Sequence, residues 1–243
     1  MTSAIVTIGV FDGVHIGHQM LVRQVVDRAH ALGLRSLAVT FDPHPELVLF
    51  PERKLTYLTR ADERERLLYE LGVDDVWTCP FTTEVARLEP EEFMRLVMER
   101  QPLAELWVGF DFALGRGRRG TLAVLSDIGV AVGWAMHIMP PLRYEGQIVS
   151  STAIRTLLAA GAVRGAADLL GRTYTVPGEL TANGVVCVDP GRALPRAGLT
   201  YVVQVGEQEH SLTLLPEPGK LQLQPTPNLP PGPTTVAFQR RRD

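Results

Sequence analysis

Short apolar runs alternate with stretches of helical periodicity along the chain up to about residue 172. Residues 5–8 predict a buried strand, and residues 17–32 predict an amphipathic helix that ends at Gly33. Later strands are predicted at 35–41, 75–79, 105–109 and 133–139, with 144–149 extending the sheet, and later helices at 59–72, 90–101, 121–127, 150–160 and 163–170. This alternation predicts an α/β domain with a parallel sheet and crossover helices.

The pattern changes at residue 174, where short alternating runs are separated by Gly, Pro and Asn turns. Strands are predicted at 174–180, 184–188, 199–205, 210–215, 220–224 and 234–238, with a proline-rich segment at 225–233. These runs predict a small all-β barrel. We therefore expect two domains, at 1–172 and 173–243.

Composition narrows the class of protein without naming a function. The hydrophobic share of 45% and charged share of 21% are ordinary for a globular protein, and the net charge of −3 argues against nucleic acid or an anionic membrane as partner. Neither a signal peptide before the first strand nor a membrane-spanning run is expected. The two lone cysteines, Cys79 and Cys187, suit a reducing cytoplasm. The sequence leaves the oligomeric state open.

The turn after the first strand carries the strongest chemical signal. Gly9, Gly13 and Gly17 allow backbone N–H groups to approach a bulky anion, and the helix that follows adds a partial positive charge. His15 and His18 are three residues apart and can both donate to phosphate oxygens. This arrangement predicts a nucleotide-phosphate site suited to transfer chemistry at phosphorus, where a preorganised donor is worth roughly 10² to 10³ in rate.

Other phosphate motifs fit this turn poorly. A Walker A loop is excluded because the only lysines are Lys54 and Lys220, and the glycine spacing does not match a dinucleotide fingerprint. A solvated turn with incidental histidines and a zinc site remain rival interpretations. No cysteine or third histidine is grouped nearby, so we expect no protein-held metal.

Two more segments follow predicted strands, at the sheet edge where α/β proteins bind ligands. Asp42-Pro43-His44-Pro45 predicts a rigid extended loop. In the segment 109–120, Phe110 and Asp111 are candidates to line a base or ribose pocket. The Arg/Gly run at 116–120 is either a basic lip over phosphates or a flexible solvated loop.

Ser150-Ser151-Thr152 and Arg155 mark a helix start that can bind an anion. Hydroxyl caps of this kind are common, so the motif carries little weight alone. Beside the histidine turn, Arg155 supplies a clamp for the outer phosphates of a triphosphate, which a chain without a Walker lysine needs.

Several motifs together resemble bacterial FAD synthetases, which combine riboflavin kinase and FMN adenylyltransferase. They are, in chain order, Ile-Gly-Val-Phe-Asp-Gly-Val-His-Ile-Gly-His, Thr-Phe-Asp-Pro-His-Pro, Val-Gly-Phe-Asp-Phe, Gly-Arg-Gly-Arg, Ser-Ser-Thr-x-Ile-Arg and Leu-Leu-Gly-Arg-Thr-Tyr. The resemblance runs from about residue 4 to 174. It implies a Rossmann-like HxGH nucleotidyltransferase domain that converts FMN and Mg·ATP into FAD and pyrophosphate.

The resemblance also implies roles for particular residues. His15 and His18 would contact the ATP phosphates, Asp111 would lie at the adenosine, and Phe41 to Pro45 would help hold the flavin. Ser151, Thr152 and Arg155 would bind the β- and γ-phosphates. The expected catalytic residues are His15, His18 and Arg155, and the expected substrate-binding residues are Gly9, Phe11, Asp12, Gly13, Phe41, Asp42, Pro43, His44, Gly109, Phe110, Asp111, Ser150, Ser151 and Thr152.

The second half departs from that family's pattern. The Gly-Phe-Pro-Thr-Ala-Asn segment of the kinase barrel is missing, although Thr181-Ala182-Asn183 copies three of its letters. None of Glu207, Glu209 and Glu217, in turn-like contexts, stands out as the catalytic Glu, and the family's C-terminal helix is not expected before Asp243. We expect a degenerate barrel without riboflavin kinase activity.

Two departures in the first domain, Leu114 where Phe is expected and Thr121 where Asp or Asn is usual, affect the expected rate and affinity more than the reaction type. Two alternative functions stay open. One is nucleotidyl transfer to another phosphorylated acceptor, and the other is a non-catalytic regulator that binds flavin or nucleotide.

Overall fold

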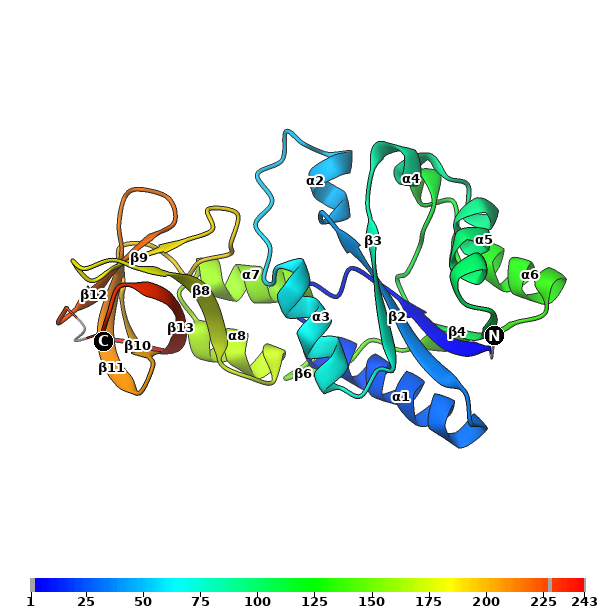
Figure 1. Ribbon diagram of the computed structural model, residues 1–243, viewed down its shortest axis with the longest axis horizontal. Coiled ribbons are helices and arrows are strands. Elements are labelled where there is room, and N and C mark those ends of the chain that lie inside the picture. The colour runs from blue at the N-terminus through cyan, green and yellow to red at the C-terminus, as the bar shows by residue number, and fades with distance from the viewer. Residues whose placement is uncertain (1–2, 227–228, 243) are drawn as a thin grey trace. The chain divides into compact units, whose positions relative to one another are not determined.

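The computed structural model describes residues 3–226 and 229–242 (Figure 1). Its contacts divide the chain into two compact units, one of residues 1–55 and 59–143 and the other of residues 56–58 and 144–243. Residues 227 and 228, in the predicted proline-rich segment, lie outside the described residues. The change of pattern in the sequence predicts a domain boundary at residue 172. This boundary stays a prediction of where the two functional domains meet.

The first unit is built on a parallel sheet, as predicted. Its strands are β1 (Ala4–Ile8), β2 (Arg35–Asp42), β3 (Asp75–Pro80), β4 (Leu103–Gly109) and β5 (Ala135–Met139). They lie in the order β3-β2-β1-β4-β5, and neighbouring strands are parallel throughout. The predicted α/β fold with a Rossmann-like sheet is therefore confirmed, with the opening strand at its centre.

Helices cover both faces of this sheet (Figure 1). They are α1 (Ile16–Leu32), α2 (Pro45–Leu49), α3 (Ala61–Glu70), α4 (Thr83–Arg87), α5 (Pro90–Arg100) and α6 (Leu122–Val132), with a 3₁₀ turn, η1, at Arg116–Arg118. Sequence periodicity missed α2 and α4, each of five residues, because they are too short to show a helical repeat. Helix α6 continues past its predicted end at Asp127 to Val132, and Gly133, in the left-handed conformation, ends it instead.

Alternate side chains of the central strand enter different halves of the core. Val6 and Ile8 of β1 pack in the cluster that includes Phe93 and Met94 of α5. Ile5 packs on the other face, in the cluster formed with α1 and α3. Burial of both faces explains why β1 reads as a continuous apolar run, and it fixes the register of the strand whose end carries the histidine turn.

The described residues of the second unit form two helices and a closed barrel, which confirms the predicted all-β module. The helices are α7 (Ser151–Ala159) and α8 (Val163–Leu170). The strands are β8 (Tyr174–Leu180), β9 (Val185–Val188), β10 (Thr200–Val205), β11 (Gln208–Leu214), β12 (Lys220–Gln224) and β13 (Gly232–Arg241). They close in the order β10-β11-β12-β9-β8-β13.

Residues 144–149 do not extend the parallel sheet, so that prediction was wrong. Strands β6 (Arg143–Tyr144) and β7 (Gln147–Ile148) pair only with each other. Glu145 and Gly146 between them have φ values of 48° and 82°, the left-handed conformation of a tight hairpin turn, which folds the segment back on itself. None of the helices in the described part of the chain is long and apolar enough to cross a membrane.

Candidate active site

The order of the sheet brings two predicted site segments together. Strand β1 pairs with β2 on one side and β4 on the other, so the strand order reverses between β1 and β4, the place where α/β sheets open a ligand crevice. Thr7 pairs in register with Trp107. Gly9 and Gly109 both come two residues later, so the turns that follow them leave neighbouring strands at the same edge.

The turn after β1 is held in an unusual backbone conformation. Phe11, Gly13 and Val14 have φ values of 52°, 81° and 39°. Left-handed backbone is costly for Phe and Val, and it persists where the surroundings fix it. The Val14 N–H donates to the Phe11 carbonyl at 2.9 Å, and both side chains are 1% exposed. A Cβ on Gly9 would meet the buried Phe11 ring at 3.0 Å, so a larger residue at position 9 would press on the ring that supports this turn.

Thr59 fixes Asp12 and Gly13 within the turn. The Asp12 carboxylate is 2% exposed and accepts from the Thr59 N–H at 3.0 Å and from its hydroxyl at 3.4 Å. The Gly13 N–H donates to the Thr59 hydroxyl at 2.8 Å. Asp12 and Gly13 were predicted to bind substrate, and in the structure both take part in shaping the turn. Sequence reasoning placed Thr59 only at a helix start, because its partners are 46 and 47 residues away.

His15 and His18 lie together at the start of α1. The Nδ1 atom of His15 accepts a hydrogen bond from the backbone N–H of His18 at 3.2 Å, which makes His15 the N-cap of the helix. In a neutral ring Nε2 of His15 then carries the proton and is a donor. The two rings stack with their centroids 3.6 Å apart, and the rings of His18 and Phe11 meet edge to face with their centroids 5.2 Å apart.

The environment of His18 keeps its ring uncharged. Burial, and then repulsion from His15, hold the pKa of His18 well below its ordinary value of 6.5. Its Nδ1 atom is buried without a hydrogen-bond partner among the described residues. A buried polar atom of this kind is costly unless a ligand or water completes it. His18 is thus a neutral group that can pair with a substrate oxygen at no cost in desolvating a charge.

The segment from Phe41 to His44 follows β2 and is structured by its own contacts. Phe41 is buried and meets the rings of Phe81 and Phe93 at 5.5 and 5.9 Å. The Asp42–Pro43 peptide is cis, and His44 accepts from the Glu46 N–H at 3.2 Å. The predicted rigid loop therefore ends at His44. Pro45 opens α2, a position where its missing N–H is not needed.

Arg64 links this loop to the histidine turn, and the sequence did not reveal it. Its guanidinium donates to the carbonyl oxygens of Phe41 at 2.6 Å and Thr59 at 2.9 Å, and the residue is only 2% exposed. Burial lowers its pKa, while the charges of Asp12 and Asp42 act in the opposite direction. In the sequence, Arg64 stands in a run of mostly charged residues at 60–66, so nothing indicates that its side chain is buried.

The turn after β4 presents two exposed side chains. The Phe112 N–H donates to the Gly109 carbonyl at 3.1 Å, which closes the turn, and Phe110 and Asp111 are exposed. Arg118 donates to the Asp111 carbonyl at 2.9 Å. The aromatic ring and the carboxylate are therefore available to a ligand next to the histidine turn.

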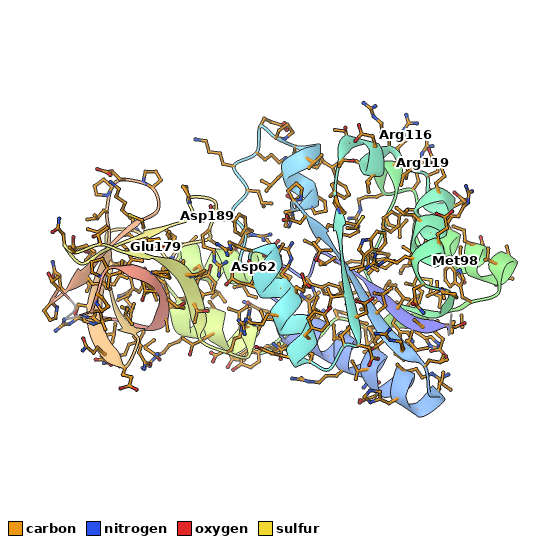
Figure 2. All side chains as sticks on the ribbon, in the orientation of Figure 1. Asp62, Met98, Arg116, Arg119, Glu179 and Asp189 are labelled. Atoms are coloured by element: carbon orange, nitrogen blue, oxygen red, sulfur yellow. The ribbon has the colours of Figure 1, made fainter. Side chains whose placement is uncertain are left out.

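The Arg/Gly segment is anchored at both ends. Leu114 and Gly120 exchange two backbone hydrogen bonds, at 3.1 and 2.9 Å, and a Cβ on Gly120 would lie 2.8 Å from the Leu114 carbonyl oxygen. Arg116 and Arg119 form ion pairs with Glu89 at 3.8 and 3.4 Å, and Figure 2 shows both arginines near α4. Exposed pairs of this kind are weak, so the arginines can exchange Glu89 for an anion.

Ser150, Thr152 and Arg155 come together at the start of α7, in the second unit. The Ser150 hydroxyl accepts from the Ala153 N–H at 3.1 Å, and Arg155 donates to the Thr152 hydroxyl at 3.3 Å. Ser151 is the first residue of the helix. The structure confirms the predicted helix start, and the roles of these residues toward phosphate stay predictions.

Comparison with known proteins decides the family. The sequence model of the FAD synthetase family matches residues 1–153, more than half of the 243-residue chain. This chain belongs to the FAD synthetase family. The matched region contains the histidine turn, the Phe41–His44 loop and the Gly109–Asp111 turn. It includes Ser150, Ser151 and Thr152, and it ends before Arg155.

Relatives within this family cover the chain to different extents. The chain is similar to a "Bifunctional riboflavin kinase/FMN adenylyltransferase" of Listeria monocytogenes, with 32% identity over 177 residues, which are 72% of this chain and 56% of that protein. It is also similar to an "FAD synthetase" of the same organism, with 31% identity over 205 residues, which are 84% of this chain and 82% of that protein. The chain thus matches little more than half the length of the bifunctional relative.

A solved structure supports the fold of this family member over its whole length. It is titled "Crystal Structure of Macrolide-efflux Protein from Streptococcus pneumoniae" and matches with a TM-score of 0.85. The alignment covers 100% of this chain and 86% of that one, at 23% sequence identity. At this identity the likeness supports the arrangement of strands and helices and carries no functional argument.

Proposed function

We propose that this chain is an FMN adenylyltransferase, which transfers AMP from Mg·ATP to FMN and releases pyrophosphate. The observation that carries the proposal is the pair of stacked, capped imidazoles of His15 and His18, at the switch point of the sheet beside the Gly109–Asp111 turn. Membership of the FAD synthetase family and the printed functions of the relatives support the same reaction.

In this reaction an oxygen of the FMN phosphate attacks the α-phosphorus of ATP. A new P–O bond forms to FMN while the bond from the α-phosphorus to the bridging oxygen breaks, and pyrophosphate leaves with its electrons. Charge accumulates on the oxygens around the α-phosphorus, and catalysis of such transfers comes mainly from positioning and charge stabilisation. We propose that Nε2–H of His15 and the ring of His18 donate to these oxygens.

Substrate groups are assigned to the neighbouring turns. Phe110 and Asp111 are proposed to contact the adenosine, because they are exposed beside the histidine turn. The segment from Phe41 to His44 is proposed to hold the flavin, and Gly9 and Gly13 to allow close approach of the phosphates. Phe11 and Asp12, which are both buried, are proposed to support the turn rather than to contact the substrate.

Magnesium is proposed to bind as part of the Mg·ATP substrate. Across residues 3–226 and 229–242, no group of three or more His, Cys, Asp or Glu side chains could hold a metal ion. Phosphate oxygens suit Mg²⁺, which keeps several waters when it binds with a nucleotide.

On the sequence motif alone, we also propose that Ser150 begins the phosphate-binding segment and that Ser151, Thr152 and Arg155 bind the β- and γ-phosphates.

We further propose that the barrel lacks riboflavin kinase activity. Thr181 forms hydrogen bonds with Val185 across the β8–β9 turn, at 3.0 and 3.2 Å, so the Thr-Ala-Asn letters belong to a hairpin turn. Glu217 pairs with Lys220, Glu207 lies in a turn, and Glu209 lies in β11, where a turn-like context was expected. Incubation of the chain with riboflavin and Mg·ATP should give no FMN, and formation of FMN would overturn this proposal.

We propose a cytoplasmic location, which the two unpaired thiols of Cys79 and Cys187 support. One incubation separates the candidate activities: the chain is mixed with FMN and Mg·ATP, and products are separated by chromatography. FAD with equimolar pyrophosphate supports the proposed reaction. Turnover only with another phosphorylated acceptor supports a different nucleotidyl transfer, and tight flavin binding without product supports a regulator.

A further inference from the structure

A cavity of about 600 Å³ lies in the second unit, formed by the turn between α7 and α8 and by strands β10, β11 and β13. This volume is in the range of pockets that bind small molecules. None of the residues assigned above to the adenylyl transfer lines it. The cavity is therefore distinct from the residues proposed for adenylyl transfer.

Positive charge is concentrated around this cavity. Its lining contains four arginines, Arg164, Arg240, Arg241 and Arg242, and one carboxylate, Glu209, which pairs with Arg240 at 3.7 Å. The chain as a whole carries a net charge of −3, so this is a local excess against an acidic background. Guanidinium groups bind phosphate through paired, charge-assisted hydrogen bonds, and several of them suit a ligand with more than one phosphate.

His210 supplies a second and independent observation. It lines the cavity and is 5% exposed, and its Nδ1 lies 3.2 Å from the carbonyl oxygen of Pro225. A carbonyl only accepts, so Nδ1 carries a proton, and Nε2 is the acceptor nitrogen when the ring carries one proton. That Nε2 is buried without a hydrogen-bond partner among the described residues. A ligand that satisfies this nitrogen must offer it a hydrogen-bond donor, such as a hydroxyl or amino group.

The geometry points to a nucleoside polyphosphate as the ligand of this cavity, bound at a site separate from the adenylyl-transfer site. The phosphates would pair with Arg240, Arg241 and Arg242, and a sugar hydroxyl or base amino group would donate to Nε2 of His210. Nε2 is almost inaccessible to water in the structure, so a ligand donor reaches it only when side chains of the lining move aside. The barrel unit thereby gains a nucleotide-binding role independent of any kinase reaction.

Histidine ring NMR locates this binding directly, because the chain has only six histidines and a His210→Gln variant assigns the His210 signals. Titration of the whole chain with ADP should shift the His210 signals. The double variant Arg240→Ala/Arg242→Ala should weaken that response by about ten-fold or more, since charge-assisted hydrogen bonds are lost. The matched control, Arg66→Ala/Arg95→Ala, removes the same charge from exposed helix positions in the first unit.

The outcomes are distinguishable from those of the adenylyl-transfer proposal. A His18→Ala variant should keep the His210 response to ADP, whatever its catalytic rate. Absence of any His210 shift with ADP, or equal weakening by the control variant, would overturn the site. If inorganic pyrophosphate shifts the Nε2 signal as ADP does, the nucleoside part of the assignment is wrong. Circular dichroism of the arginine variants confirms that exposed substitutions leave the barrel folded.

Discussion

The Nδ1 atom of His15 accepts a hydrogen bond from the backbone N–H of His18, and the two imidazole rings stack 3.6 Å apart. One histidine thereby caps the helix and fixes the other in place. The two residues therefore differ in what they can offer a ligand. Nδ1 of His15 already accepts the capping hydrogen bond, whereas Nδ1 of His18 has no hydrogen-bond partner among the described residues.

Replacing His18 by alanine should lower FAD formation by roughly 10² or more, because a donor aimed at the reacting phosphate is lost. The KM for ATP should change far less than kcat, since the interaction strengthens in the transition state. Steady-state kinetics measure both values. His30→Ala, an exposed histidine at the end of the same helix, is the control and should keep the parent rate. A near-normal rate for His18→Ala would remove His18 from the mechanism.

The lowered pKa of His18 predicts how stability depends on pH. The unfolded chain binds this proton more tightly than the folded protein does, so stability rises with pH as the unfolded form loses the proton. The contribution is fully present above about pH 6.5 and is lost as the pH falls through the folded-state pKa. Urea unfolding at about pH 7.5 and about pH 5.5 measures it. His18→Gln should shrink the difference between the two, and an unchanged difference would contradict the assignment.

Thr59→Val should destabilise the first unit by about 1–3 kcal/mol, because it leaves the buried Gly13 N–H without its acceptor and takes a hydroxyl donor from Asp12. The turn before His15 would loosen, so kcat should fall as well. Thr59→Ser keeps the hydroxyl and should restore most of both properties. Chemical denaturation and FAD assays on the two variants check this. Loss in Thr59→Ser with near-parent behaviour in Thr59→Val would show that the methyl group, not the hydrogen bond, matters.

Arg64→Lys should not rescue the loss seen in Arg64→Met. Arg64 reaches two carbonyl oxygens, on Phe41 and Thr59, with two nitrogens of one planar group, which a single ammonium cannot reproduce. Because Phe41 begins the proposed flavin loop, both variants should raise the KM for FMN more than the KM for ATP. Steady-state kinetics on each variant measure the KM for FMN and the KM for ATP. Equal effects on the two substrates would reduce Arg64 to general stability.

Arg155→Ala should raise the KM for ATP by about ten-fold or more through the loss of a charge-assisted phosphate contact. The KM for FMN should change little. Arg95→Ala, an exposed arginine on α5 that belongs to neither proposed site, is the matched control for charge. An ATP KM that is unchanged in Arg155→Ala would take Arg155 out of the phosphate site.

Much of the fold followed from the sequence because each long element carried its own periodic signal. The central strand β1, helix α1 and its end at Gly33, and the exact bounds of α8, β8 and β12 needed only local pattern and cap residues. Helices α2 and α4 gave no signal because they are single turns. The β6–β7 hairpin was misread because tertiary pairing, not local propensity, decides which strand an extended segment joins.

The site was predictable where chemistry is local and hidden where it depends on distant partners. His15 and His18 were evident because a histidine pair at a helix start after a glycine turn is itself a chemical pattern. Thr59 and Arg64 were not, because their importance lies in contacts with Asp12 and Phe41 that only the folded chain creates. The same limit concealed the cavity beside His210, whose arginines come from two segments far apart in sequence.

The most direct test of the central claim follows the α-phosphate. The purified chain is incubated with FMN and Mg·ATP labelled at the α-phosphorus. FAD and pyrophosphate are then separated, the amount of each is measured, and the label in each is counted. We expect label in FAD, equimolar unlabelled pyrophosphate, and loss of both in His18→Ala. FMN recovered unchanged, with the label remaining in ATP, would contradict that claim.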